Sequence, residues 1–188
     1  MADSRFSVVG TPLAGLKSVT RKRLGDERGF LSRLFCRDEL SAAGFRNPIV
    51  QINHTLTRIP GTVRGFHFQF SPFSEDKFVS VLAGEVFDVA IDLRAGSPTF
   101  LQWHGERLSQ ENGKSLFIPK GFAHGFQTLT PNCELVYLHT QAYEPTAEGG
   151  LNALDPRLAV VWPLAVSDMS ARDRNHPMIQ SGFTGITP

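Results

Sequence analysis

The residue with the clearest chemical potential is His67, which lies inside the apolar run Arg64–Gln69. A histidine in an apolar strand is either a packed side chain with one hydrogen-bond partner or a general base, because imidazole titrates near neutral pH. Residues that donate protons, carry charge or orient an imidazole recur in similarly apolar segments, namely Lys77, His124, Tyr137 and Asp173. The presence of these residues favours acid–base chemistry over simple packing of His67.

Each of these residues, taken singly, also has a structural interpretation. Lys77 fits a solvated strand end, Tyr137 a core position and Asp173 a helix cap. Only their combination indicates a site. Lys77 can point inward at the start of its strand. Period two places Tyr137 on the same face as Leu135 and His139, which favours a buried hydroxyl that needs a partner.

Composition narrows the class of protein and its partners. At 188 residues and 41% hydrophobic composition, the chain suits one buried core and is short for two domains. Lys plus Arg (19) nearly cancels Asp plus Glu (18), so nucleic acid and membrane surfaces are not expected partners. The N-terminus lacks the apolar core of a signal peptide, and Cys36 and Cys133 lack a CxxC spacing. We therefore expect a cytoplasmic protein with free thiols.

Short strands joined by tight turns dominate the sequence. Phe (15), Gly (17) and Pro (12) are frequent, and turn residues between short apolar runs are typical of a sandwich or barrel. One short helix is expected over 37–44 and another from Ser170. The prediction is an all-β fold with a few short helices, whose clearest strands are 48–57, 62–70, 77–82, 85–93, 115–119, 125–129 and 134–139.

The spacing of Gly113, Pro119, Gly121 and His124 matches the second half-motif of the cupins, which are double-stranded jelly-roll barrels. Pro and Gly would turn the chain sharply and leave His124 at the barrel mouth. The first half-motif would run from Gly61 to His67.

A metal-binding cupin would carry a second histidine two residues after His67, where this chain has Gln69. Glu75 lies near the place of a carboxylate ligand, but two histidines, a glutamine and a misplaced glutamate suit a divalent metal poorly. We expect no metal and no cofactor. A metal-dependent cupin, such as an oxygenase or isomerase, is the alternative that this argument disfavours.

Strand periodicity adds one condition to the site. Period two places His67 and Gln69 on one face with Gly65, and sends Phe66 to the other face with the neighbouring phenylalanines. Arg64 falls on the wrong face, so its use in the same site requires a bulge near Gly65.

Across nearly its whole length, the chain resembles the dTDP-4-dehydrorhamnose 3,5-epimerases, which are metal-independent cupins. The matching runs are Gly25–Phe30, Gln51–Asn53, Arg64–Gln69, Gly84–Arg94, Ser97–Thr99, Ile118–Phe126, Asp155–Pro156, Trp162–Pro163 and Ser170–Asp173. The resemblance implies an isomerase that inverts C3, C5 or both in a nucleotide-linked 4-keto-6-deoxy sugar. The expected reaction converts dTDP-4-dehydro-6-deoxy-D-glucose to dTDP-4-dehydro-L-rhamnose, in deoxysugar or rhamnose biosynthesis.

The resemblance also implies roles for single residues. His67 would be the general base, Asp173 its orienting carboxylate, Lys77 the partner of the sugar C4 oxygen, and Tyr137 the acid on the opposite face of the ring. Such a set suits the chemistry, because a proton taken from carbon beside a ketone leaves charge on the ketone oxygen. The substrate-holding positions would be Arg28, Gln51, Asn53, Arg64, His124 and Tyr143.

Several positions on the expected nucleotide side depart from the family pattern, among them Leu31 and Leu138. Arg33 stands where the family usually has Glu, and Glu75 where it usually has Gln. We include both among the substrate-binding candidates. The departures leave open another nucleoside diphosphate in place of dTDP. A non-catalytic sugar-nucleotide-binding cupin is the alternative from another functional class.

The resemblance further implies a homodimer in which an N-terminal segment adds to the partner's sheet. The apolar stretch 31–35 suits this role, and Arg28 and Arg33 would then enter the neighbouring site. We expect one cupin epimerase domain over 1–188, with N-terminal strands and a dimer arm in 1–47, a barrel core in 48–145 and a C-terminal wrap in 146–188.

Overall fold

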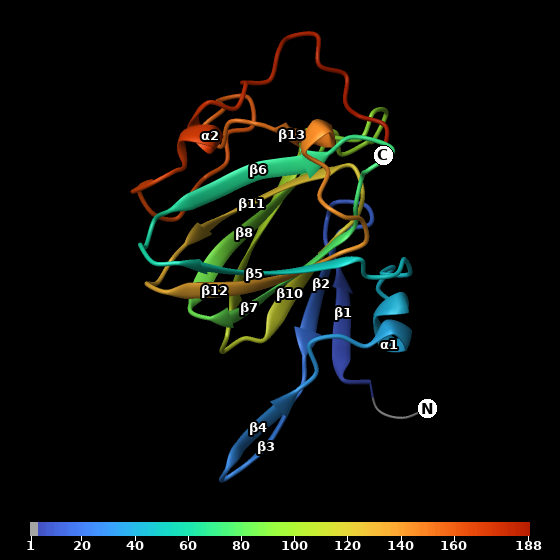
Figure 1. Ribbon diagram of the computed structural model, residues 1–188, viewed down its shortest axis with the longest axis vertical. Coiled ribbons are helices and arrows are strands. Elements are labelled where there is room, and N and C mark those ends of the chain that lie inside the picture. The colour runs from blue at the N-terminus through green and yellow to red at the C-terminus, as the bar shows by residue number, and fades with distance from the viewer. Residues whose placement is uncertain (1–3) are drawn as a thin grey trace.

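Two antiparallel sheets face each other in the computed structural model, which describes residues 4–188 (Figure 1). The first sheet has six strands, in spatial order β1 (Phe6–Gly10), β2 (Lys17–Arg21), β10 (Lys114–Ile118), β7 (Lys77–Ala83), β12 (Cys133–His139) and β5 (Gln51–Thr57). The second has five, in order β13 (Glu148–Gly150), β6 (Val63–Gln69), β11 (Phe122–Thr128), β8 (Glu85–Asp92) and β9 (Trp103–Ser109).

Between β5 and β12 the chain crosses from one sheet to the other at nearly every turn, the exception being the β8–β9 pair. This is the double-sheet jelly roll, so the predicted all-β cupin-type barrel is confirmed. β5 and β6, which both carry predicted site residues, therefore lie in opposite sheets.

The main core fills the space between the sheets. On β7, Val79 and Val81 are fully buried in it, while Phe78 faces outward into a smaller cluster around Leu40 and Phe45. The same alternation turns Lys77 toward the inside of the barrel at its mouth, as the sequence predicts.

The helices are few and short. α1 (Arg37–Ser41) ends before Gly44, whose φ of +105° suits a residue without a Cβ. α2 (Ala171–Arg174) begins after Ser170, as expected, and η1 (Pro145–Ala147) is a single 3-10 turn. None of the helices described here could cross a membrane.

The C-terminal segment covers the outer face of the five-stranded sheet. Phe66 and Phe68 of β6 pack there against Met169, Ile179 and other residues of this segment. The phenylalanines thus occupy the face opposite His67, as period two predicts. Their packing places α2 against β6 (Figure 1).

Two of the N-terminal strands lie outside both sheets. β3 (Arg23–Asp26) and β4 (Gly29–Ser32) pair only with each other and form a hairpin that projects away from both sheets (Figure 1). The apolar stretch 31–35, which the sequence suggests for pairing with the partner's sheet, includes the end of β4 at Ser32 and continues beyond it. Arg33, just beyond it, forms an ion pair with Glu39 of α1.

Candidate active site

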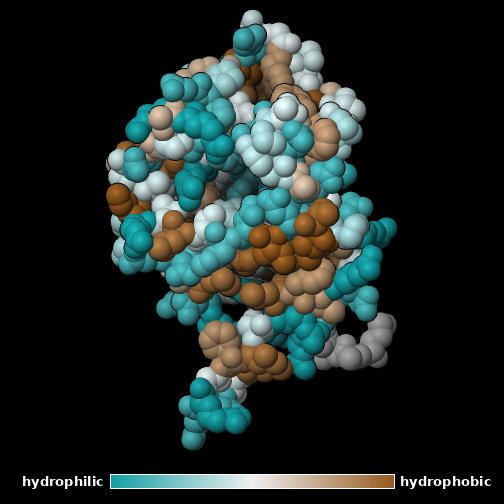
Figure 2. All heavy atoms as spheres, in the orientation of Figure 1, coloured by the Kyte–Doolittle hydropathy of each residue, from teal (hydrophilic) through white to brown (hydrophobic). Residues whose placement is uncertain are grey.

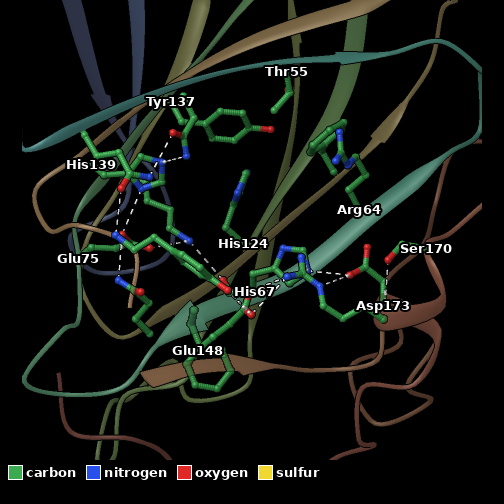
Figure 3. A pocket seen from close by; sticks show the side chains of 18 residues that line it. Thr55, Arg64, His67, Glu75, His124, Tyr137, His139, Glu148, Ser170 and Asp173 are labelled. Carbon is green, nitrogen blue, oxygen red and sulfur yellow. Dashed lines mark hydrogen bonds and ion pairs between the residues drawn. The ribbon is translucent and has the colours of Figure 1, made fainter. Parts of the chain in front are cut away.

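A cavity of about 450 Å³ opens between the two sheets at the barrel mouth (Figure 3). The predicted residues that line it are His67, Tyr137, Lys77, Asp173, Gln51, Asn53, Arg64, His124, Tyr143 and Glu75. Sequence positions as distant as 51 and 173 therefore meet at one place.

His67 and Asp173 form a hydrogen-bonded pair on one wall. His67 Nε2 lies 2.8 Å from Asp173 Oδ1, and the backbone N–H of Gly65 donates to Oδ2 at 3.3 Å. Burial would raise the pKa of Asp173, but the hydrogen bond and charge of His67 outweigh it and lower that pKa. Asp173 is thus a carboxylate that fixes a proton on Nε2, which leaves Nδ1 of His67 as the basic nitrogen.

Asp173 is held by its own helix as well. Its backbone N–H donates to the side chain of Ser170 at 3.0 Å, which caps the start of α2. Asp173 itself is therefore not the cap, and its side chain is free to face His67. The helix-cap interpretation of Asp173 is wrong, and Ser170 takes that role.

Tyr137 and His124 line the cavity from other strands. The ring of Tyr137 on β12 lies 6.0 Å from the ring of His124 on β11, and His124 Nε2 donates to buried Asp88 at 2.8 Å. Burial, and then the negative charge of Asp88, raise the pKa of Tyr137. Its hydroxyl therefore keeps its proton at neutral pH. Because β6 and β12 belong to opposite sheets, His67 and Tyr137 approach the cavity from different walls.

Lys77 is paired inside the cavity. Its Nζ lies 3.1 Å from Glu75 Oε1, and Glu75 Oε2 accepts from His139 Nδ1 at 3.1 Å. Burial would raise the pKa of Glu75, but the charge of Lys77 and the contact with His139 outweigh it and lower that pKa. The cavity therefore holds an ammonium and a carboxylate side by side.

The bulge that Arg64 requires is present. On paired strands β6 and β11, His67 lies opposite His124, whereas Arg64 lies opposite Phe126, so the register shifts between them. Gly65 has a φ of +122°, and a Cβ there would come within 2.6 Å of Gly125 Cα. This close approach brings Arg64 and His67 to the same cavity, as the sequence predicts.

Arg28 and Arg33 do not line the cavity of their own chain. Arg28 lies in the β3–β4 turn with 89% of its side chain exposed and pairs with Asp26 at 2.5 Å. The hairpin carries it away from the barrel mouth (Figure 1). Within one chain, the two predicted arginines are therefore apart from the other site residues.

The cavity also contains residues that the sequence did not single out as site residues. Arg172 Nη1 donates to Glu148 Oε1 at 3.0 Å, and its Nη2 lies 3.4 Å from His67 Nε2. Arg172 stands in the run Ser170–Asp173, which could have drawn attention to it, whereas Glu148 had no such signal. The others missed are Thr55, Phe68, Gln69, Phe126, His139 and Ser170.

A group of side chains around His67 brings possible metal ligands together. His67, Asp173 and His176 bring possible ligand atoms within 4.8 Å of one another. However, His67 Nε2 is already bonded to Asp173, and the Arg172 guanidinium beside it opposes a second cation. Gln69 Nε2 points elsewhere, to the carbonyls of Phe73 and Ala142. The metal-free interpretation stays a prediction, supported by these contacts.

The barrel and its lining define the class of protein: a cupin-type enzyme whose cavity is equipped for proton transfer. The sequence profile of the dTDP-4-dehydrorhamnose 3,5-epimerase family matches residues 10–181. The chain belongs to this family.

Individual relatives cover most of the chain. The dTDP-4-dehydrorhamnose 3,5-epimerase of Salmonella typhimurium is 38% identical over 94% of this chain and 97% of its own length. The crystal structure of a dTDP-6-deoxy-D-glucose-3,5-epimerase from Legionella pneumophila, in complex with dTDP-4-keto-L-rhamnose, has a TM-score of 0.89 and 40% identity, and the match covers 97% and 99% of the two chains. A dTDP-4-dehydrorhamnose 3-epimerase of Streptomyces niveus is 34% identical over 94% of this chain and 86% of its own.

The close approach at Gly65 predicts that a larger residue there destabilises the protein. Gly65→Ala forces a Cβ against the backbone of β11 and holds an alanine at a positive φ, which strains its backbone. The free energy of unfolding should therefore fall by about 3 kcal/mol. Gly182→Ala is the matched control, because a Cβ there meets nothing within 4 Å. Urea unfolding of both variants checks this, and equal midpoints would contradict the close approach.

Proposed function

We propose that this protein inverts C3 and C5 of dTDP-4-dehydro-6-deoxy-D-glucose and yields dTDP-4-dehydro-L-rhamnose. The observation that carries the proposal is the pair of proton-transfer groups on different walls of one cavity, His67 on β6 and Tyr137 on β12. Inversion requires removal of a proton from one face of a carbon and delivery to the other. Membership of the epimerase family supports the same reaction.

In the proposed reaction His67 Nδ1 takes the proton from the carbon beside the C4 ketone. The C–H electron pair forms the enolate double bond, and the carbonyl π electrons move to the C4 oxygen. The ammonium of Lys77 stabilises that oxyanion, a contribution typically of about 3 kcal/mol. Tyr137 then protonates the carbon from the opposite face, and the ketone re-forms. Solvent restores the proton of Tyr137 and removes that of His67.

Asp173 supports the base without touching the substrate. Its carboxylate holds the Nε2 proton of His67 and stabilises the imidazolium that forms when Nδ1 accepts the substrate proton. The side chain of Asp173 is almost fully buried, so little water competes for it.

The polar rim of the cavity is proposed to hold the nucleotide. Gln51 and Asn53 of β5 lie beside each other, and the backbone N–H of Tyr143 donates to Gln51 Oε1 at 3.0 Å. Arg64 offers a guanidinium, which binds phosphate oxygens in pairs. The dTDP-sugars of the relatives make dTDP the first choice of nucleotide.

A second candidate is inversion at C3 alone. The Streptomyces niveus relative, a 3-epimerase, favours keeping it, because one base and one acid can serve either one carbon or two. The two activities differ in how many carbons exchange hydrogen with solvent.

Variants at the base and the acid test the proposed roles. In deuterium oxide, His67→Asn should lose wash-in of deuterium by about a thousandfold, because the base is absent. Tyr137→Phe should keep wash-in but lose inversion, since deprotonation occurs without delivery to the opposite face. NMR of the sugar measures both deuterium wash-in and inversion. A chelator is present in these assays, because no step of the proposed reaction needs a metal. Unchanged inversion by Tyr137→Phe would remove Tyr137 from the mechanism, and wash-in by neither parent nor variants would favour a binding protein.

We further propose a homodimer in which the β3–β4 hairpin of one protomer meets edge strand β5 of the other. The outer face of β5 and its approach expose Val50, Ile52 and Leu56, and the hairpin exposes Phe30 and Leu31. Apolar surface is visible at the level of β5 and near the hairpin (Figure 2). Such a pairing would cover an edge strand, and would bring Arg28 and Arg33 to the neighbouring cavity.

Complementation tests this arrangement. Arg28→Ala and His67→Asn are each expected to be weakly active alone. In a mixed dimer, the Arg28→Ala protomer keeps His67 and receives Arg28 from its partner, so co-refolding equal amounts should restore about a quarter of parental activity. Separately refolded proteins, mixed afterwards, are the control. Activity no greater than the sum of the two variants would show that Arg28 does not serve the neighbouring site.

A further inference from the structure

Glu75 lies between the proposed catalytic lysine and a histidine deep in the cavity. Its two carboxylate oxygens are divided, with Oε1 on Lys77 Nζ at 3.1 Å and Oε2 on His139 Nδ1 at 3.1 Å. About a tenth of each of the three side chains is exposed. The buried position of Glu75 thus differs from that of a surface residue in contact with the diphosphate of the substrate.

The carboxylate is held in place from several strands. Gln69 Nε2 of β6 also approaches Glu75 Oε2, at 3.3 Å. Nε2 of His139, on β12, lies 3.4 Å from Nδ2 of Asn53 on β5. The His139 ring also stacks on the ring of Tyr137, with 6.1 Å between the ring centroids. His139 therefore lies between two polar partners, with Nδ1 facing the carboxylate of Glu75 and Nε2 facing the amide of Asn53.

The ammonium of Lys77 lies in a buried environment, where a charge without a partner raises the free energy. The next inward side chain on its strand is the fully buried Val79, and the other polar contact of Nζ is the backbone oxygen of His67 at 3.5 Å. Burial of an unpaired ammonium favours loss of its proton. The other titratable groups that line this cavity are His67, His124, Tyr137, His139, Asp173, Tyr143 and Glu148, with Arg64 and Arg172 as fixed cations. Among the described residues, Glu75 is the carboxylate in ion-pair contact with Lys77.

We propose that Glu75, fixed by His139 and Gln69, is a positioning residue that keeps Lys77 charged and aimed at the reacting carbonyl, and so extends catalysis into the alkaline range. The inference rests on the proposed epimerase function. Because the pKa of Glu75 is lowered, its carboxylate is charged over the whole neutral and alkaline range. A neutral lysine could still donate a hydrogen bond to the C4 oxygen but would no longer supply positive charge to the enolate.

Glu75→Gln tests the proposal because it keeps the shape of the side chain and removes its charge. The alkaline limb of the kcat profile should move to lower pH by about one to three units, the usual effect of one nearby opposite charge. At pH 6 kcat should stay within about threefold of the parent, whereas at pH 9 it should fall about tenfold or more, with KM little changed. His139→Gln should shift the limb in the same direction by less, because Lys77 keeps its partner.

The chain offers a matched control outside the cavity. Glu106 contacts Lys114 at 2.6 Å and His104 at 3.6 Å, which reproduces the same three residue types. Glu106→Gln should leave the pH profile of kcat unchanged. Thermal unfolding of all variants checks that they are folded.

Acetylation of Lys77 by acetic anhydride, followed by peptide mass spectrometry, provides a readout that does not need activity. The pH of half-maximal labelling should be lower in Glu75→Gln than in the parent. A Glu75→Gln profile that superimposes on the parent's, or an equal loss at every pH, would overturn the inference while the epimerase function stands. Should Glu75→Gln not fold, an unmoved limb and labelling pH in His139→Gln would overturn it. Absence of deuterium wash-in with the parent would instead defeat the proposed function itself.

Discussion

The hydrogen bond between His67 and Asp173 joins two parts of the chain that are 106 residues apart. One partner stands on a strand of the barrel, and the other on a four-residue helix in the C-terminal segment. So short a helix has little stability of its own, and its position depends on the apolar packing of the segment against Phe66 and Phe68. The outer face of β6 thus fixes the carboxylate, while the inner face of the same strand presents the histidine.

The jelly roll supplies the second requirement, which is separation of base and acid. Because successive strands alternate between two sheets, one cavity receives β6 from one side and β12 from the other. Burial keeps the proton on Tyr137, and a buried carboxylate accompanies Lys77. In the proposed mechanism, the two sheets therefore act as the two faces from which a flat enolate loses and gains its proton.

Strand periodicity predicted much of this arrangement. Alternation along β7 placed Lys77 inward, and the misfit of Arg64 with period two predicted the irregularity at Gly65. The contacts of Glu75 could not be predicted, because it lies in a loop before β7 where no alternation applies, and its partners His139 and Gln69 come from β12 and β6. The family resemblance associated Arg28 with the site, but a single chain places it on a projecting hairpin, so the proposed role of Arg28 requires the proposed dimer.

In the proposed reaction, one cavity performs two stereochemical inversions through an enolate. The most direct measurement is NMR of dTDP-4-dehydro-6-deoxy-D-glucose incubated with the unmodified protein in deuterium oxide. Deuterium is expected at both C3 and C5, with accumulation of dTDP-4-dehydro-L-rhamnose. Deuterium at neither carbon, with the sugar unchanged, would contradict the proposed reaction.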